Sequence, residues 1–142
     1  MSRPIQILLM VLAVVAGLFV GGLLNMGVLS LIPQFFPYPD GVDPNVPENI
    51  AAFMKTAPIG AFMLVWLAHW GQAFVGAIIA ALIAPKRKMV CAMIVGFLTL
   101  VGGVLAVFMI PSPVWNVVID LIGYLPLAWL GAKLVGDRGM SV

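Results

Sequence analysis

The stretch IQILLMVLAVVAGLFVGGLLNMGVLSLI, residues Ile5–Ile32, decides the fold class because it runs without a charged side chain. About 20 helical residues cross the ~30 Å hydrocarbon core of a bilayer. Only helices and closed barrels cross it, since every backbone polar group must find a partner inside the structure. The stretch lacks the alternation of a barrel strand and is far longer than one. It therefore predicts a retained membrane-spanning helix rather than a signal segment, whose apolar part is about 7–15 residues long.

Three further stretches have the same character, at Pro58–Ala84, Met89–Ile110 and Pro113–Ala132. Hydrophobic residues make up 63% of the chain and charged residues 8%, whereas a soluble domain has roughly 25% charged residues. This composition excludes a cytosolic enzyme and a nucleic-acid-binding module. We predict one all-α membrane domain over residues 1–142, a bundle of four transmembrane helices with an outer loop at 33–57.

The few basic side chains predict how this bundle is oriented. Lys and Arg accumulate in short cytoplasmic loops, and six of the seven fall on one side of the predicted helices. They are Arg3, Lys86, Arg87, Lys88, Lys133 and Arg138, the last beside Asp137, whereas Lys55 lies in the outer loop. Both termini are therefore expected in the cytoplasm, and the membrane is expected to be the cell inner (plasma) membrane. The turn Lys86–Lys88 is also expected to contact anionic lipid headgroups.

The outer loop, residues 33–57, begins with a proline-rich part that disfavours a long helix. From Pro47 the pattern changes, with Glu48 in a first helical turn and with Ile50, Phe53 and Met54 at helical spacing. This pattern predicts a short amphipathic helix that lies along the outer membrane surface.

Small residues recur at helical spacing in every predicted span. Lipid gives helices little hydrophobic reason to associate, so close packing through small side chains must hold them together. The first span has Gly17 and Gly21, and the other spans have Ala73, Ala77, Ala81, Gly96, Gly103, Gly123 and Gly131. These positions predict a compact bundle rather than four loosely tethered helices.

Two ionisable side chains, His69 and Asp120, fall at membrane depth, where such groups are costly and are functional candidates. At 1.5 Å per residue, Asp120 lies about 10 Å and His69 about 16 Å below the outer ends of their spans. The other polar side chains at overlapping depths are Asn25, Gln72, Asn116 and Tyr124. Asn116, Asp120 and Tyr124 share one helix face because they are spaced four residues apart. We predict that these side chains form a polar cluster in the outer half of the bundle.

Two interpretations of this cluster are open. In the first, the cluster stabilises the packing of the helices: Asp120 accepts hydrogen bonds from Asn25, Asn116 or His69, each worth ~1 kcal/mol in a membrane. Alternatively, Asp120 is protonated and uncharged. In the second, it is a proton or cation site in which Asp120 and His69 exchange a proton. Trp66 and Trp70 flank the level of His69, and they either pack on neighbouring helices or line a pocket for a flat lipid or pigment.

Metal sites and catalysis find little support in the sequence. Cys91 lies near the cytoplasmic end, far from His69, and one His with one Asp is too few ligands for structural zinc. A single axial His69 can hold a haem, but no second feature points to one. Ser30, Thr99 and Ser112 are scattered and have no paired base. We expect no cofactor, no metal and no enzymatic activity.

A set of residues in the second half of the chain resembles a pattern in small, uncharacterised four-helix proteins of bacterial inner membranes. These residues are Ala68-His69, Pro111-x-Pro113-x-Trp115, Asp120 and Pro126-x-Ala128-Trp129-x-Gly131. The resemblance covers residues 68–131, and it implies no known activity.

The function expected from the sequence follows from what the chain has and lacks. It is nearly all predicted membrane helix, carries small-residue contact positions and has no catalytic constellation. We predict a non-enzymatic accessory or assembly subunit of a larger membrane complex, or a homo-oligomer. Its partners would be the lipid bilayer and other membrane subunits or itself, without nucleic acid. The alternative is a small proton- or cation-coupled transporter or channel that uses Asp120 and His69.

Overall fold

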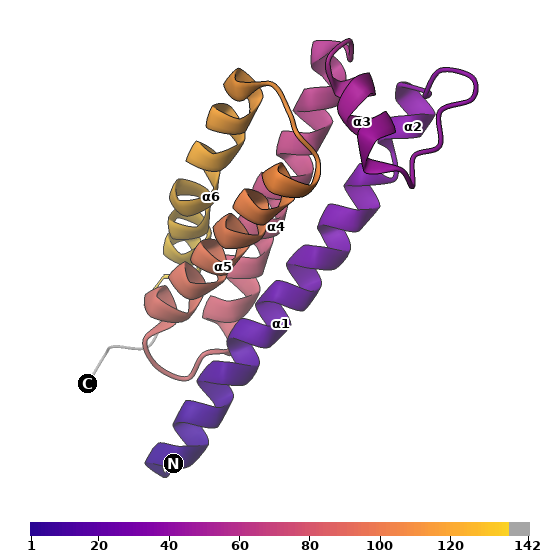
Figure 1. The fold of residues 1–142 in the computed structure, drawn as a ribbon. Helices are drawn as coiled ribbons and strands as arrows, with labels where there is room; N and C mark the ends of the chain where they lie inside the picture. The colour runs from indigo at the N-terminus through magenta and orange to yellow at the C-terminus, as the bar shows by residue number, and fades with distance from the viewer. Residues whose placement is uncertain (137–142) are drawn as a thin grey trace.

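The computed structural model describes residues 1–136, and the regular elements in this range are all helical. The long helices are α1 (Arg3–Leu29), α4 (Ile59–Ile83), α5 (Lys88–Met109) and α6 (Val114–Val135), and the short ones are α2 (Ile32–Phe35) and α3 (Pro47–Met54) (Figure 1). The four long helices are long and apolar enough to cross a membrane. The predicted all-α architecture with four candidate membrane spans is therefore confirmed. Asp137 and Arg138, which entered the charge count above, lie outside the described residues.

Successive long helices run in opposite directions, so the bundle has two distinct ends (Figure 1). The N-terminus, the α4–α5 turn and the C-terminal end of α6 lie at one end, which we call the basic end because it holds Arg3, Lys86, Arg87 and Lys133. The segments α2 and α3 and the α5–α6 link lie at the other end, which we call the capped end.

Two helix ends differ from the prediction by three residues, and the other ends by one or two. Helix α1 stops at Leu29 instead of Ile32, because Pro33 has no N–H to donate to the Leu29 carbonyl, and Ser30 Oγ donates to the Gly27 carbonyl at 2.6 Å. Helix α6 continues past the expected end at Ala132 to Val135. The charged Lys133 is tolerated in the last turn because its Nζ lies 4.3 Å from the centroid of the Trp129 ring.

Glycine positions bring the long helices close to the backbone or side chains of their neighbours, as their spacing predicts. Between α1 and α4, a Cβ added at Gly76 would lie 2.8 Å from the carbonyl oxygen of Gly17. The other close pairs are Gly21 with Gln72, Gly96 with Ala128, Gly103 with Tyr124, Gly123 with Trp70 and Gly131 with Phe74. Larger side chains at these glycines would push the helices apart, so the small residues set the interhelical distance.

Helices α1 and α5 meet near the basic end and separate towards the capped end (Figure 1). Near the basic end, Ala13 of α1 shares a buried cluster with Cys91 and Val95 of α5. Nearer the capped end, a Cβ added at Gly22 of α1 or at Gly102 of α5 would have no atom within 4 Å. This separation leaves room for the cavity described below.

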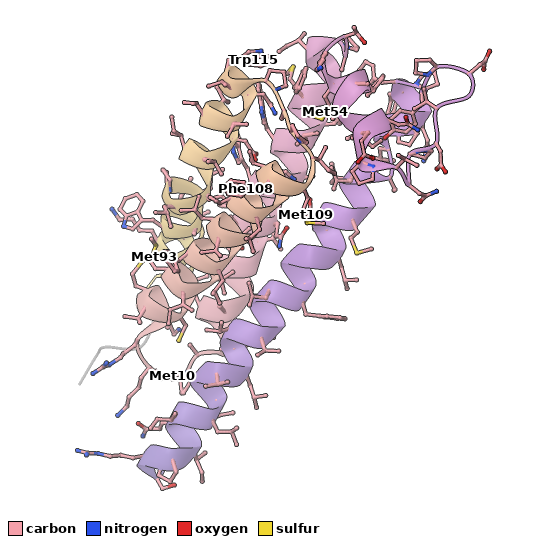
Figure 2. The ribbon with its side chains drawn as sticks, viewed as in Figure 1. Met10, Met54, Met93, Phe108, Met109 and Trp115 are labelled. Carbon is pink, nitrogen blue, oxygen red and sulfur yellow. The ribbon has the colours of Figure 1, made fainter. Side chains whose placement is uncertain are left out.

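Large apolar side chains cover the outside of the long helices. Phe19, Met26 and Phe108 have 66%, 70% and 80% of their surface exposed, and Figure 2 shows Phe108 on α5 among the other outward side chains. A monomer in water rarely exposes so much contiguous apolar surface. A lipid environment removes this difficulty, in keeping with the four candidate membrane spans.

Candidate functional site

The polar centre of the bundle is a pair formed by His69 of α4 and Asp120 of α6. His69 Nδ1 lies 3.0 Å from Asp120 Oδ1 and 2.9 Å from Oδ2. The side chains are 20% and 8% exposed, respectively. With its proton on Nδ1, the imidazole donates to the carboxylate, and this bond fixes the orientation of the ring. The ring nitrogen Nε2 has no bond to the rest of the described chain.

Asp120 has two more hydrogen-bond donors from its surroundings. Tyr124, one turn further along α6, donates its hydroxyl to Asp120 Oδ2 at 3.2 Å. Trp70 Nε1 of α4 donates to the backbone carbonyl of Asp120 at 2.9 Å. Tyr124 is only 1% exposed, and its ring packs against Gly103 of α5. Asp120 is therefore held by donors from both α4 and α6.

A second set of hydrogen bonds lies nearer the capped end. Trp66 Nε1 of α4 donates to Asn116 Oδ1 at 2.8 Å. The amide nitrogen of Asn116 donates in turn to Ser112 Oγ at 2.8 Å. The rings of Trp66 and Trp70 stack with their centroids 5.9 Å apart. One face of α6 is thus joined to one face of α4 by successive polar contacts.

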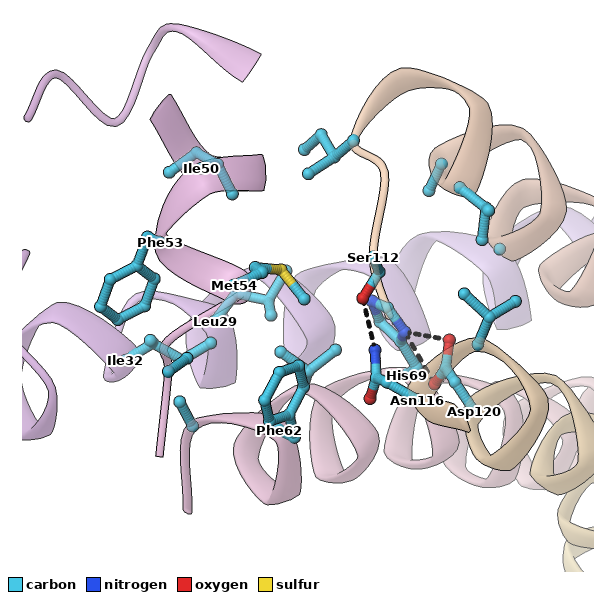
Figure 3. Close-up of a pocket in the computed structure, with 18 of the residues that line it drawn as sticks. Leu29, Ile32, Ile50, Phe53, Met54, Phe62, His69, Ser112, Asn116 and Asp120 are labelled. Carbon is cyan, nitrogen blue, oxygen red and sulfur yellow. Dashed lines mark hydrogen bonds and ion pairs between the residues drawn. The ribbon is translucent and has the colours of Figure 1, made fainter. Parts of the chain in front are cut away.

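A cavity of about 460 Å³ reaches from the loop at the capped end to the His69–Asp120 pair (Figure 3). Residues of α1, α4, α5 and α6 form its walls, and residues of α3 and its flanking loop also line it. The polar lining consists of Asn25, Tyr38, His69, Ser112, Asn116 and Asp120, and the apolar lining includes Leu29, Ile32, Phe62, Val65, Ala106 and Val107. The cavity is mostly apolar, with its polar groups concentrated at the deep end and on the α1 wall.

The apolar face of α3 contributes Ile50, Phe53 and Met54 to this cavity. Figure 3 shows these side chains at one end of the cavity and the His69–Asp120 pair at the other. The face that the sequence predicts among lipid headgroups is therefore directed at the cavity. The Tyr38 ring packs edge-on against Phe53 with centroids 4.9 Å apart, which ties the proline-rich part of the loop to α3.

The structure brings together part of the predicted cluster. His69, Asn116, Asp120 and Tyr124 lie along one α4–α6 seam, but Asp120 is bonded to His69 and Tyr124, not to Asn25 or Asn116. Asn25 lines the cavity from α1, and its Oδ1 is buried without a hydrogen-bond partner in the described chain.

Gln72 lies apart from the cavity, and its side chain packs beside Gly21 at the α1–α4 contact. It is polar and at the expected depth, but the rotation of α4 directs it at a different neighbour. The predicted cluster therefore divides into an α4–α6 seam, a single cavity-lining amide and a packing residue.

Three hydrogen-bonding roles in the seam were not predicted, those of Ser112, Trp66 and Trp70. Ser112 lies in the link before α6, four residues ahead of Asn116, and its hydroxyl reaches the Asn116 amide. The indole N–H of a buried tryptophan needs an acceptor, which would have connected Trp66 and Trp70 with the facing polar stripe. Both signals are present in the sequence.

The remaining predicted positions lie away from this site. Within residues 1–136, no group of three or more His, Cys, Asp or Glu residues is placed to hold a metal ion. Cys91 is buried near the basic end among Ala13, Ala80 and Val95. At the α4–α5 turn, Lys86 and Arg87 are exposed and Lys88 is half-buried.

The seam provides a carboxyl group that is hydrogen-bonded by His69 and Tyr124, and an imidazole whose Nε2 has no partner in the described chain, beside a mostly apolar cavity. Such a pair can bind a polar group or exchange a proton, but no nucleophile is placed beside it in the described residues. Comparison with known proteins gives no match to any family model, curated protein or solved structure.

Proposed function

We propose that this chain is a non-enzymatic, multi-pass protein of the cell inner membrane, with the basic end in the cytoplasm and the capped end outside. The clustering of Arg3, Lys86, Arg87 and Lys133 at one end supports this orientation, because basic residues are retained on the cytoplasmic side. In sealed cells, a membrane-impermeant amine reagent should label Lys55 and leave Lys86 unlabelled. Labelling of Lys86 from outside would reverse the orientation.

Within that membrane, we propose that the protein acts by association, as an accessory or assembly subunit or as a homo-oligomer. The observation that carries this proposal is the use of the deep polar groups inside the bundle: His69 and Tyr124 both hydrogen-bond to Asp120. The His69–Asp120 contact joins α4 to α6. Because these polar groups are used inside the bundle, the protein would bind its partners through its outer surface. On α1, that surface presents Phe19, Leu23 and Met26, all more than half exposed.

Purification in a mild detergent, followed by native mass spectrometry, tests association. We expect the chain to appear bound to itself or to other membrane subunits. Replacing Phe19 and Met26 together by Ala should weaken that association, because both side chains point away from the bundle. A matched change on the same helix, Gly27→Ala, should have little effect, because a Cβ there meets no atom within 4 Å. A chain that is only monomeric under conditions that preserve other complexes contradicts the proposal.

A second candidate is a small proton- or cation-coupled carrier, and one specific feature favours it. The cavity joins the capped end to the His69–Asp120 pair, while close packing of Gly96 against Ala128 closes the bundle on the other side of the pair. A site reached from one end only is the form expected of one state of a carrier. In proteoliposomes, Asp120→Asn should abolish flux without changing expression. An unmodified protein that moves no solute or proton across a broad panel removes this candidate.

A further inference from the structure

Association with other subunits does not account for the cavity. Its volume, about 460 Å³, falls in the size range of small-molecule sites. It combines a long apolar wall with a few polar groups near one end, the usual composition of a ligand pocket. We propose that it binds the head of an uncharged lipid that carries a hydroxyl group, with the hydrocarbon chain passing into the bilayer between α1 and α5.

The side of entry follows from helix geometry. Gly22 lies on the same face of α1 as Asn25 and Leu29, three and seven residues further on, and both of these line the cavity. Gly102 is one turn from Ala106, which lines the cavity from α5. A Cβ added at Gly22 or at Gly102 would meet nothing within 4 Å. The cavity therefore has an uncovered side between α1 and α5, where a membrane protein faces hydrocarbon.

The described lining residues offer a ligand no unpaired charged group, and this indicates the class of head. Among the described residues that line the cavity there is no Lys, Arg or Glu, and the one carboxylate, Asp120, already faces His69. A phosphate head would lose its hydration there without gaining a cation. An ammonium head would meet a carboxylate that is already hydrogen-bonded by His69 and Tyr124. An uncharged head avoids both costs.

The free hydrogen-bonding groups favour a hydroxyl. Asn25 Oδ1 is buried without a partner, which is costly unless a ligand or water supplies a donor. The terminal torsion of asparagine is soft, so the amide can turn its oxygen or its nitrogen to a ligand. In the tautomer that donates from Nδ1 to Asp120, Nε2 of His69 is an acceptor that faces no other group of the described chain. Ser112 Oγ accepts from Asn116 and keeps its own hydrogen to donate. A hydroxyl, which both donates and accepts, satisfies this set.

Native mass spectrometry of the full chain in mild detergent tests the class of ligand. The probes are a long-chain polyprenol and a diacylglycerol, which share the hydroxyl and differ in the number of chains. The controls are the methyl ether of the polyprenol, which lacks the O–H donor, and phosphatidic acid, which is anionic. We expect one of the two hydroxyl lipids to bind one per chain, at least tenfold more tightly than either control. Equal binding of a control, or no binding of either hydroxyl lipid, overturns the proposal.

Two glycine variants test the route. Gly102→Leu places a side chain in the uncovered side of the cavity and should reduce hydroxyl-lipid binding at least tenfold. Gly27→Leu is the matched control, because a Cβ at Gly27 also meets nothing within 4 Å, but Gly27 is on the opposite side of α1 from Asn25. It should leave binding unchanged. Equal effects of the two substitutions, or none from Gly102→Leu, contradict entry between α1 and α5.

Asn25→Leu tests the polar contact. It should weaken hydroxyl-lipid binding about fivefold, the loss expected for one hydrogen bond, and should leave the weak binding of the methyl ether as it is. The variant removes an unpaired buried polar atom, so the unliganded chain should be no less thermally stable than the original. Unchanged affinity for the hydroxyl lipid contradicts the proposed role of Asn25. The same spectra report the oligomeric state, so failure of lipid binding is distinguishable from failure of association.

Discussion

The two halves of the bundle are built from similar helices but in different ways. Near the basic end, α1, α4 and α5 meet through small residues such as Ala13, Gly17, Gly76 and Ala80. Near the capped end, α4 and α6 are joined by polar side chains while α1 stands away from α5. One half is closed by backbone contact, and the other is held open around a cavity.

This difference shows that small residues alone do not close a membrane bundle. Gly22 and Gly102 have no neighbour for a Cβ, although Gly17 on the same helix as Gly22 touches the backbone of α4. The capped half also contains Phe62, Trp66 and Trp115, whose rings pack edge to face. Bulky rings and polar pairs fix α4 to α6 there, whereas α1 keeps its contact with α4 and separates from α5.

The largest expected effect is on the closed half. Gly17→Leu should cost at least about 2 kcal/mol of unfolding free energy, because a Cβ at this position collides with the Gly76 carbonyl oxygen and the backbone cannot yield cheaply. Gly22→Leu, in the open half, should change stability by no more than about 0.5 kcal/mol. Reversible unfolding in mixed micelles measures both. Equal losses of unfolding free energy in the two variants would mean that α1 is packed to the same degree along its whole length.

An intermediate effect is expected for the polar pair of the open half. A double-mutant cycle with His69→Phe and Asp120→Leu should give a coupling of about 1 kcal/mol, the usual size for hydrogen bonds between membrane helices. Each single variant should cost more than the coupling alone, since it leaves one buried polar group without its partner. Unfolding of the four proteins under one set of conditions provides the numbers. A coupling near zero would remove the pair from the forces that join α4 to α6.

The smallest effect is expected for the hydroxyl of Tyr124. Tyr124→Phe should lose about 0.6 kcal/mol, since one membrane hydrogen bond to Asp120 is removed and the ring is kept. Thr99→Val is the matched control, because Thr99 Oγ donates to Val95 within its own helix, at 2.8 Å, and joins no two helices. Thr99→Val should therefore change the free energy of unfolding less than Tyr124→Phe. If Thr99→Val costs more than Tyr124→Phe, the closed half also depends on polar contacts, and the contrast between the two halves weakens.

Much of the fold was predictable because its signals are local. Span length and hydropathy identify the four long helices, and the spacing of Gly17 and Gly21 identifies the contact face of α1. The ends were less predictable. The continuation of α6 past Lys133 depends on the side chain bending over Trp129, a contact that composition does not reveal.

The sequence predicts the membrane depth of the site residues but not which of them form hydrogen bonds with one another. Counting residues places His69, Gln72 and Asn25 at overlapping levels, yet it does not say which helices are neighbours. His69 meets Asp120 because α4 packs against α6. Asn25 does not bond to Asp120, because α1 packs against α4 and α5 and the cavity intervenes. Sequence periodicity determines the depth of a residue and the helix face on which it lies. Which residues pair with each other depends on how whole helices pack.

Disulfide trapping across the opening between α1 and α5 tests the contrast of the two halves most directly. In a Cys91→Ser background, Gly22→Cys and Gly102→Cys are combined and native membranes are oxidised. A disulfide brings its two Cβ atoms to about 3.5–4.5 Å, whereas α1 and α5 separate towards the capped end (Figure 1). We predict that both thiols stay free and react with a membrane-permeant maleimide. Rapid formation of the intramolecular disulfide would show that α1 and α5 meet at the capped end and that the cavity has no opening to the lipid.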